Sequence, residues 1–103
     1  MKTHAAKRVE IIIEAPLSNR LCDALEQVDV TGFTELPVLG GSGRSGRWSR
    51  DGQVSTIGGM VMVVCIIKPE RLDRLLEAAF AVVEPHIGVI SVTDCDVVRA
   101  ERF

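Results

Sequence analysis

The feature that most constrains the fold is a strand–proline–helix pattern that occurs twice in the 103-residue chain. The segments IIIEAPLSNRLCDAL and VCIIKPERLDRLLEA each lead from an apolar run through a proline into a helical pattern. Apolar residues spaced three and four apart follow each proline, which indicates an amphipathic helix. Proline suits the first helical turn because an N–H would have no partner there. Two copies of one supersecondary unit therefore make up most of the chain.

The pattern predicts strands at residues 8–14, 30–39, 60–67 and 89–98, with helices that begin at Pro16 and Pro69. Pro37 makes the second strand an edge, a bulge or a bend, because proline cannot donate to a sheet ladder. The order is that of an α+β, ferredoxin-like βαββαβ sandwich, one domain over residues 1–103. With both helices on one face, the other face of the sheet is bare. Its outward positions are expected to be apolar, so we expect a closed oligomer to cover them.

Composition excludes several classes of function. A net charge of −2 does not favour a nucleic-acid or membrane-surface partner. Cys22, Cys65 and Cys95 are far apart and lack zinc-ligand spacing, so free thiols in a reducing compartment and no metal site are expected. No run reaches about 20 apolar residues and no signal peptide is evident, so the protein is expected to be cytoplasmic without stable membrane insertion.

Residues 40–59 (GGSGRSGRWSRDGQVSTIGG) form the one breaker-rich stretch. Its glycines and serines offer no packing face, so a flexible loop is expected there. Loops of this length in small domains are usually functional. Trp48 is expected to contact either the rest of the fold or, together with Arg50, a partner protein.

Two motifs then suggest a family. Thr31-Gly32-Phe33-Thr34, followed by Gly40-Gly41-Ser42-Gly43-Arg44, resembles the second strand and T-loop entrance of the PII signal-transduction family. Weaker likenesses follow in the right order: Pro69 to Leu75 resembles the start of the second helix, 85–88 the B-loop, and 93–99 the last strand. Together they cover about 90 residues.

The resemblance implies a PII-type homotrimer that binds an adenine nucleotide between subunits and signals through a T-loop at about 40–59. The chain departs from the nitrogen-sensing members because it has no tyrosine, and its B-loop lacks the phosphate-binding lysine. It is more similar to the PII-like branch, and closest to the carboxysome-associated type. That branch implies bicarbonate as a ligand, and a bicarbonate transporter or carboxysome component as the unidentified target.

The expected site combines glycines, whose backbone N–H groups are open to phosphate, with arginines, which present a charged fork to anions. Nucleotide is expected at Gly32, Phe33, Thr34, Gly40, Gly41, Gly43, Arg44, Met62, Val64, His86, Ile87, Gly88, Arg99 and Arg102. Bicarbonate is expected at Gly43, Arg44, Ser45 and Arg47. Because phosphate-binding cations are few, ADP or AMP is expected ahead of ATP or cyclic AMP, with no tightly bound cofactor.

Three alternatives remain open at this stage. A nitrogen-regulatory PII sensor is one, and a metal-tolerance trimer of the CutA type, which shares the fold, is another. An acylphosphatase-like enzyme would need an anion-cradling loop after the first strand. Glu14-Ala15-Pro16-Leu17 is acidic and proline-blocked there, and no nucleophile–base pair stands out, so no catalytic residues are expected.

Overall fold

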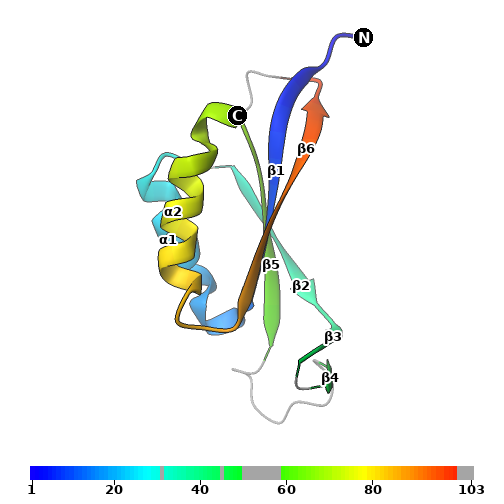
Figure 1. The fold of residues 1–103 in the computed structure, drawn as a ribbon, viewed down its shortest axis with the longest axis vertical. Coiled ribbons are helices and arrows are strands. Elements are labelled where there is room, and N and C mark those ends of the chain that lie inside the picture. The colour runs from blue at the N-terminus through cyan, green and yellow to red at the C-terminus, as the bar shows by residue number, and fades with distance from the viewer. Residues whose placement is uncertain (31, 45, 50–58, 100–103) are drawn as a thin grey trace.

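A computed structural model describes residues 1–30, 32–44, 46–49 and 59–99 (Figure 1). Two helices and a main sheet alternate along the chain as the sequence predicts, with a 3-10 turn at each proline before the helix proper. The elements are β1 (His4–Glu14), α1 (Ser18–Gln27), β2 (Phe33–Val38), β3 (Gly40–Gly43), β4 (Gly46–Ser49), β5 (Met60–Ile67), α2 (Leu72–Val83) and β6 (Gly88–Val97).

The main sheet has the strand order β2-β5-β1-β6, and its three pairings are antiparallel. The predicted ferredoxin-like α+β fold is therefore confirmed. Pro37 lies in β2, at an edge of the sheet, where one side of the strand has no ladder hydrogen bonds to lose. β5 is an interior strand, in agreement with its nearly continuous apolar sequence.

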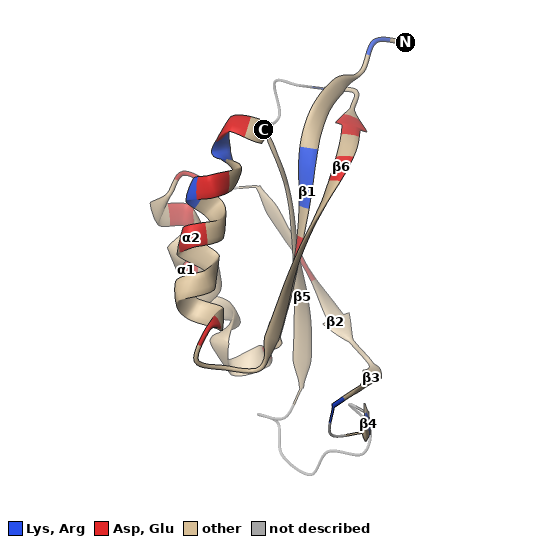
Figure 2. Ribbon diagram, in the orientation of Figure 1, with Lys and Arg blue, Asp and Glu red and all other residues tan. Residues whose placement is uncertain are grey.

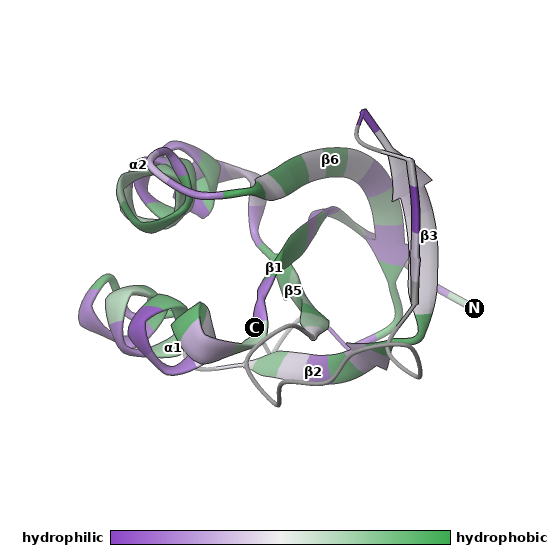
Figure 3. Ribbon diagram, turned by 90° about the horizontal axis from the view of Figure 1, so that it is seen from below, coloured by the Kyte–Doolittle hydropathy of each residue, from purple (hydrophilic) through white to green (hydrophobic). Residues whose placement is uncertain are grey.

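Both helices cover one face of this sheet (Figures 1 and 3). Val9, Ile11 and Ile13 of β1 point into that layer and are 0% exposed. They pack in one buried cluster with residues of both helices, which are Leu21, Leu25, Leu75, Ala79, Val82 and Val83. The alternation along β1 follows from the two-residue period of a strand, which sends successive side chains to opposite faces.

The other, open face of the sheet is mixed in character, and this corrects the prediction that its outward positions are apolar. The register aligns Leu36, Met62, Ile12 and Val89 in one apolar row across the four strands. The neighbouring rows include the charged side chains of Arg8, Glu10 and Glu14, because these residues alternate with the buried ones along β1.

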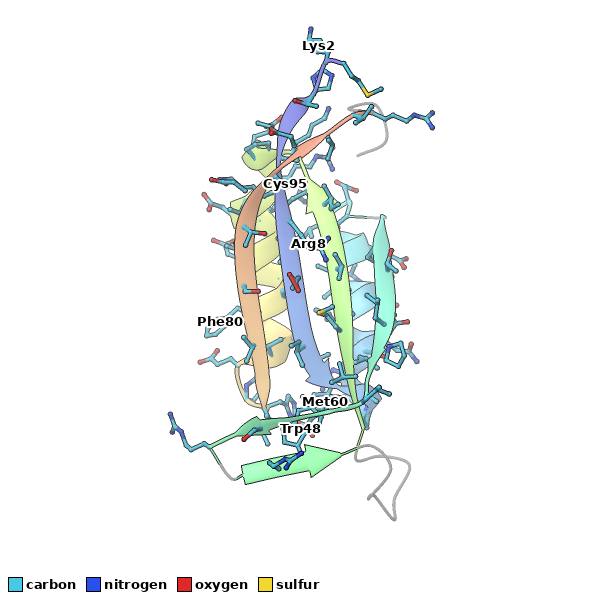
Figure 4. The ribbon with its side chains drawn as sticks, turned by 90° about the vertical axis from the view of Figure 1, so that its right-hand side faces the viewer. Lys2, Arg8, Trp48, Met60, Phe80 and Cys95 are labelled. Atoms are coloured by element: carbon cyan, nitrogen blue, oxygen red, sulfur yellow. The ribbon has the colours of Figure 1, made fainter. Side chains whose placement is uncertain are left out.

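Regular structure occurs where the sequence analysis expects a flexible loop. Residues 40–43 and 46–49 pair as an antiparallel hairpin, with Gly41 opposite Trp48 and Gly43 opposite Gly46. Gly46 has a φ of 102°, a left-handed conformation that favours glycine at the turn. Trp48 is half-buried against Gly41. Of the two expected contacts, the described residues therefore show the one with the protein's own chain. The hairpin lies across the lower end of the open face (Figure 4).

Candidate functional site

A pocket of about 510 Å³ lies at the upper end of the open face, where β1 and β2 begin. Its walls come from the start of β2, the ends of β5 and β6, and one residue of β1. They are Arg8, Gly32, Phe33, Thr34, Leu36, Val64, Ile66, Val97 and Arg99. The pocket therefore combines an aliphatic floor with a threonine hydroxyl and two guanidinium groups.

Strand register is what assembles these residues. Thr34 lies opposite Val64, and Arg8 lies opposite both Ile66 and Thr93. The start of β2 is fixed by the turn that follows α1. There Asp29 has a φ of 66°, and its carbonyl accepts a hydrogen bond of 3.1 Å from Arg71 Nη1. This link from the 3-10 turn before α2 to the turn after α1 thus helps to set where Gly32 enters the pocket.

Arg8 is the charged centre of the upper pocket (Figure 4). Its Nε donates to Glu10 Oε2 at 3.4 Å, and both residues lie on the open face because they are two positions apart in β1. Both side chains are partly exposed, so the pair contributes little to stability. Its main effect is to hold a guanidinium over the pocket floor.

The opposite, lower end of the sheet gathers a second group of residues. Ile13 pairs with Gly88, and Glu14 pairs with Met60, so the turn at 84–88 and the chain that leaves the 40–59 segment meet there. The Ala15 N–H donates to the Gly59 carbonyl at 2.8 Å. The Ile87 N–H donates to Glu14 Oε1 at 3.2 Å. The hairpin adds Arg44 and Arg47, which are exposed and lie among residues without a carboxylate (Figure 2).

The predicted site residues therefore fall into two separate groups within one chain. Gly32, Phe33, Thr34, Val64 and Arg99 line the upper pocket, and Met62 lies in the next row of the open face. The lower group contains Gly40, Gly41, Gly43, Arg44, His86, Ile87 and Gly88. Along β5, the pocket residues Val64 and Ile66 lie four and six residues from Met60 at the lower end, which corresponds to about 13 and 20 Å. Ser45, Arg50 and Arg102 lie outside the described residues.

Four pocket residues are absent from the sequence prediction, namely Arg8, Leu36, Ile66 and Val97. Arg8 carried a usable signal, because charged residues at alternate positions of an apolar strand mark its solvent-facing side. The others could not be assigned without the register of β5 and β6.

The thiols take no part in this arrangement. All three cysteines are free, and burial raises the pKa of the Cys65 thiol to about 11. Burial also raises the pKa of Cys22, with the Glu35 carboxylate as a further cause. Among the residues that the structure describes, no group of three or more His, Cys, Asp or Glu side chains could hold a metal ion. Within the same part of the chain, neither helix is long and apolar enough to cross a membrane.

Comparisons with known proteins agree with this fold. The structure superposes with a TM-score of 0.84 on CPII, a nitrogen regulatory PII-like protein from Thiomonas intermedia K12, bound to ADP, AMP and bicarbonate. The identity is 28%, over 95% of this chain and 92% of that chain. CPII bound to ADP and bicarbonate gives a TM-score of 0.80 at 30% identity, over 95% of this chain and 93% of that one.

A candidate PII-like signalling protein from Thermus thermophilus also has a TM-score of 0.80, with 25% identity over 100% of this chain and 99% of its own. No curated protein sequence matches the chain. The family profile "Nitrogen regulatory protein P-II" matches residues 6–102. Because that match spans nearly the whole ferredoxin-like domain, the chain belongs to the P-II family of nitrogen regulatory proteins.

Proposed function

We propose that this protein is a non-catalytic, cytoplasmic signalling protein that binds ADP or AMP, together with bicarbonate, where the subunits of a homotrimer meet. Ligand binding changes the conformation of the T-loop, residues 40–59, and thereby the affinity for a target protein. A bicarbonate transporter or a carboxysome component is the proposed target. The ligands of CPII support the choice of ADP, AMP and bicarbonate as ligands, because those structures hold them.

One observation carries the proposal: the two groups of site residues lie toward opposite ends of one sheet, with about 13–20 Å of β5 between them. Neither group alone combines the aliphatic floor of the upper pocket with the glycine backbone of the lower end. In the proposed homotrimer, a ring of identical subunits with head-to-tail contacts, the upper pocket of one subunit would face the lower group of the next. Each nucleotide site would then be built from two subunits, and a trimer would hold three such sites.

The chemistry of each group suits one part of a nucleotide. The aliphatic floor of the upper pocket, with Val64 and Ile66, offers a dry surface for a purine ring, and Thr34 offers a hydroxyl. At the lower end, the glycine backbone of the hairpin offers donors to phosphate, and the Ile87 N–H could do so by exchanging its Glu14 acceptor. Arg44 there, and Arg8 or Arg99 from the neighbour, would supply the positive charge.

Bicarbonate is proposed at the tip of the hairpin. Gly43 and Gly46 close the turn, and Arg44 and Arg47 flank it with two positive charges. A planar anion can accept paired hydrogen bonds from one guanidinium. We include Ser45 in this site on sequence grounds, and Arg50 with Trp48 in the surface that contacts the target.

Isothermal titration calorimetry with ATP, ADP, AMP and cyclic AMP, each with and without bicarbonate, tests the ligand assignment. We expect binding of ADP and AMP to be tighter than that of ATP, and bicarbonate to change the affinity. Light scattering on the same sample should give the mass of three chains. A monomer, or a sample that binds none of the four nucleotides, would refute the proposal.

A further inference from the structure

Glu14 places a carboxylate among the proposed phosphate donors. It is the last residue of β1 and is half-buried on the open face, with its Oε1 3.2 Å from the Ile87 backbone nitrogen. The next residue, Ala15, donates to the Gly59 carbonyl. Glu14 therefore touches the 84–88 turn directly, and it adjoins the end of the 40–59 segment through the chain.

This contact identifies the Ile87 N–H as an anion-binding group. The donor is already paired with a negative oxygen that the protein itself supplies. A phosphate oxygen at the same N–H would have to displace the carboxylate or lie beside it. Either arrangement brings two negative charges close together at this exposed contact, and their repulsion raises the cost of binding.

The lower group has little positive charge to offset that repulsion. The 84–88 turn contributes Glu84 and His86 and no lysine or arginine. The described cations at this end are Arg44 and Arg47, and both lie in the hairpin. The cost of a longer phosphate chain should thus rise with each added charge.

On this basis we propose that Glu14 is the specificity-determining residue that limits the number of phosphates the site accepts. The inference rests on the proposed nucleotide site and extends it: the carboxylate acts as a charge filter that favours a nucleoside monophosphate over the diphosphate, and the diphosphate over the triphosphate. The filter depends on the negative charge of Glu14 and not on its hydrogen bond to Ile87. A neutral side chain of the same shape would keep that hydrogen bond but lose the charge.

Glu14→Gln is the direct test, because glutamine retains an oxygen that can accept from the Ile87 N–H. Calorimetry with AMP, ADP and ATP on wild type and variant gives three affinity ratios. We expect the affinity of the variant relative to wild type to rise with the number of phosphates. The increase should be at most about threefold for AMP and about tenfold or more for ATP. Glu14→Ala, which removes both charge and acceptor, should give the same order if the filter is electrostatic.

Glu77→Gln is the matched control. It removes the same charge from an exposed position on α2, and all three affinities should stay unchanged. Equal gains for the three nucleotides, or no gain, would overturn the filter while nucleotide binding itself stands. Absence of binding by wild type and every variant would overturn both the filter and the proposed function.

Discussion

The indole ring of Trp48 covers Gly41 so closely that a Cβ at position 41 would lie 2.9 Å from Trp48 Cζ2. The two residues are direct partners in the β3–β4 hairpin. Any larger residue at position 41 would therefore have to displace the indole ring, in addition to any effect on the role of the Gly41 N–H in phosphate binding. The contact also explains how a stretch rich in glycine and serine forms a hairpin, since one large side chain covers the opposite strand.

Gly41→Ala should displace the indole ring, because the added methyl group and Trp48 Cζ2 cannot both keep their positions. Trp48 is the only tryptophan, so its fluorescence reports this site alone. We expect emission at longer wavelength and stronger quenching by acrylamide in the variant. The free energy of unfolding should fall by less than about 1 kcal/mol, since the hairpin is outside the main core.

Gly43→Ala is the control for this experiment, because a Cβ at position 43 meets nothing within 4 Å. Its emission spectrum should match that of wild type. An unchanged spectrum for Gly41→Ala would show that Trp48 does not rest on Gly41 in solution.

Gly88→Ala should destabilise the whole domain. A Cβ there would lie 2.7 Å from Val83 Cγ1 and 3.0 Å from the Ile12 carbonyl oxygen, and neither group can move freely in the packed layer. Overpacking of this kind costs about 1–3 kcal/mol. Urea unfolding at fixed protein concentration should show the loss. Gly59→Ala, with open space around the new methyl group, should unfold like wild type.

The sequence predicted the main fold well because its signals are local. The apolar run of β5 is bounded by Gly59 on one side and Lys68-Pro69 on the other, and the observed strand ends at these limits. The prolines likewise marked where both helices begin. The hairpin was missed because its order depends on a cross-strand contact between Trp48 and Gly41, which no periodicity within one strand reveals.

The candidate site could be predicted only in part, for a related reason. The run Gly32 to Thr34 was found through its motif, and it does line the pocket. Arg8 joins it only because β1 pairs with β5 in a register that sets Arg8 beside Ile66. The separation of the two groups is equally a product of topology, since residues 32 and 40 flank the same strand at opposite ends.

Stability should depend on pH in the alkaline range through Cys65. Burial raises the pKa of this thiol in the folded protein to about 11, whereas an unfolded chain ionises its thiols near pH 8.5. Between these values the unfolded state releases a proton that the folded state retains, so the contribution is fully present below about pH 8.5 and is lost as pH rises toward 11. The loss in free energy of unfolding should be about 2.5 kcal/mol at pH 10.5.

The difference in free energy of unfolding between wild type and Cys65→Ala isolates the contribution of Cys65 from that of other groups that titrate at high pH. The variant should be less stable at pH 8 because it leaves a small cavity, but it should lose less stability between pH 8 and pH 10.5. If the free energies of unfolding of the two proteins fell in parallel with pH, Cys65 would ionise as readily in the folded state as in the unfolded one.

Subunit mixing tests whether each nucleotide site is shared between neighbours. Arg8→Ala damages the upper pocket and Arg44→Ala the lower group, so each variant alone should bind ADP weakly. When the two variants are co-expressed in equal amounts, about a quarter of the interfaces join an intact upper pocket to an intact lower group, given random assembly of a closed ring. ADP binding should recover to that extent.

A mixture of Arg8→Ala with Thr34→Val, both in the upper pocket, should recover no ADP binding. If the first mixture also fails to recover, the two groups act within one chain, and one ligand would have to span the about 13–20 Å of β5 between them.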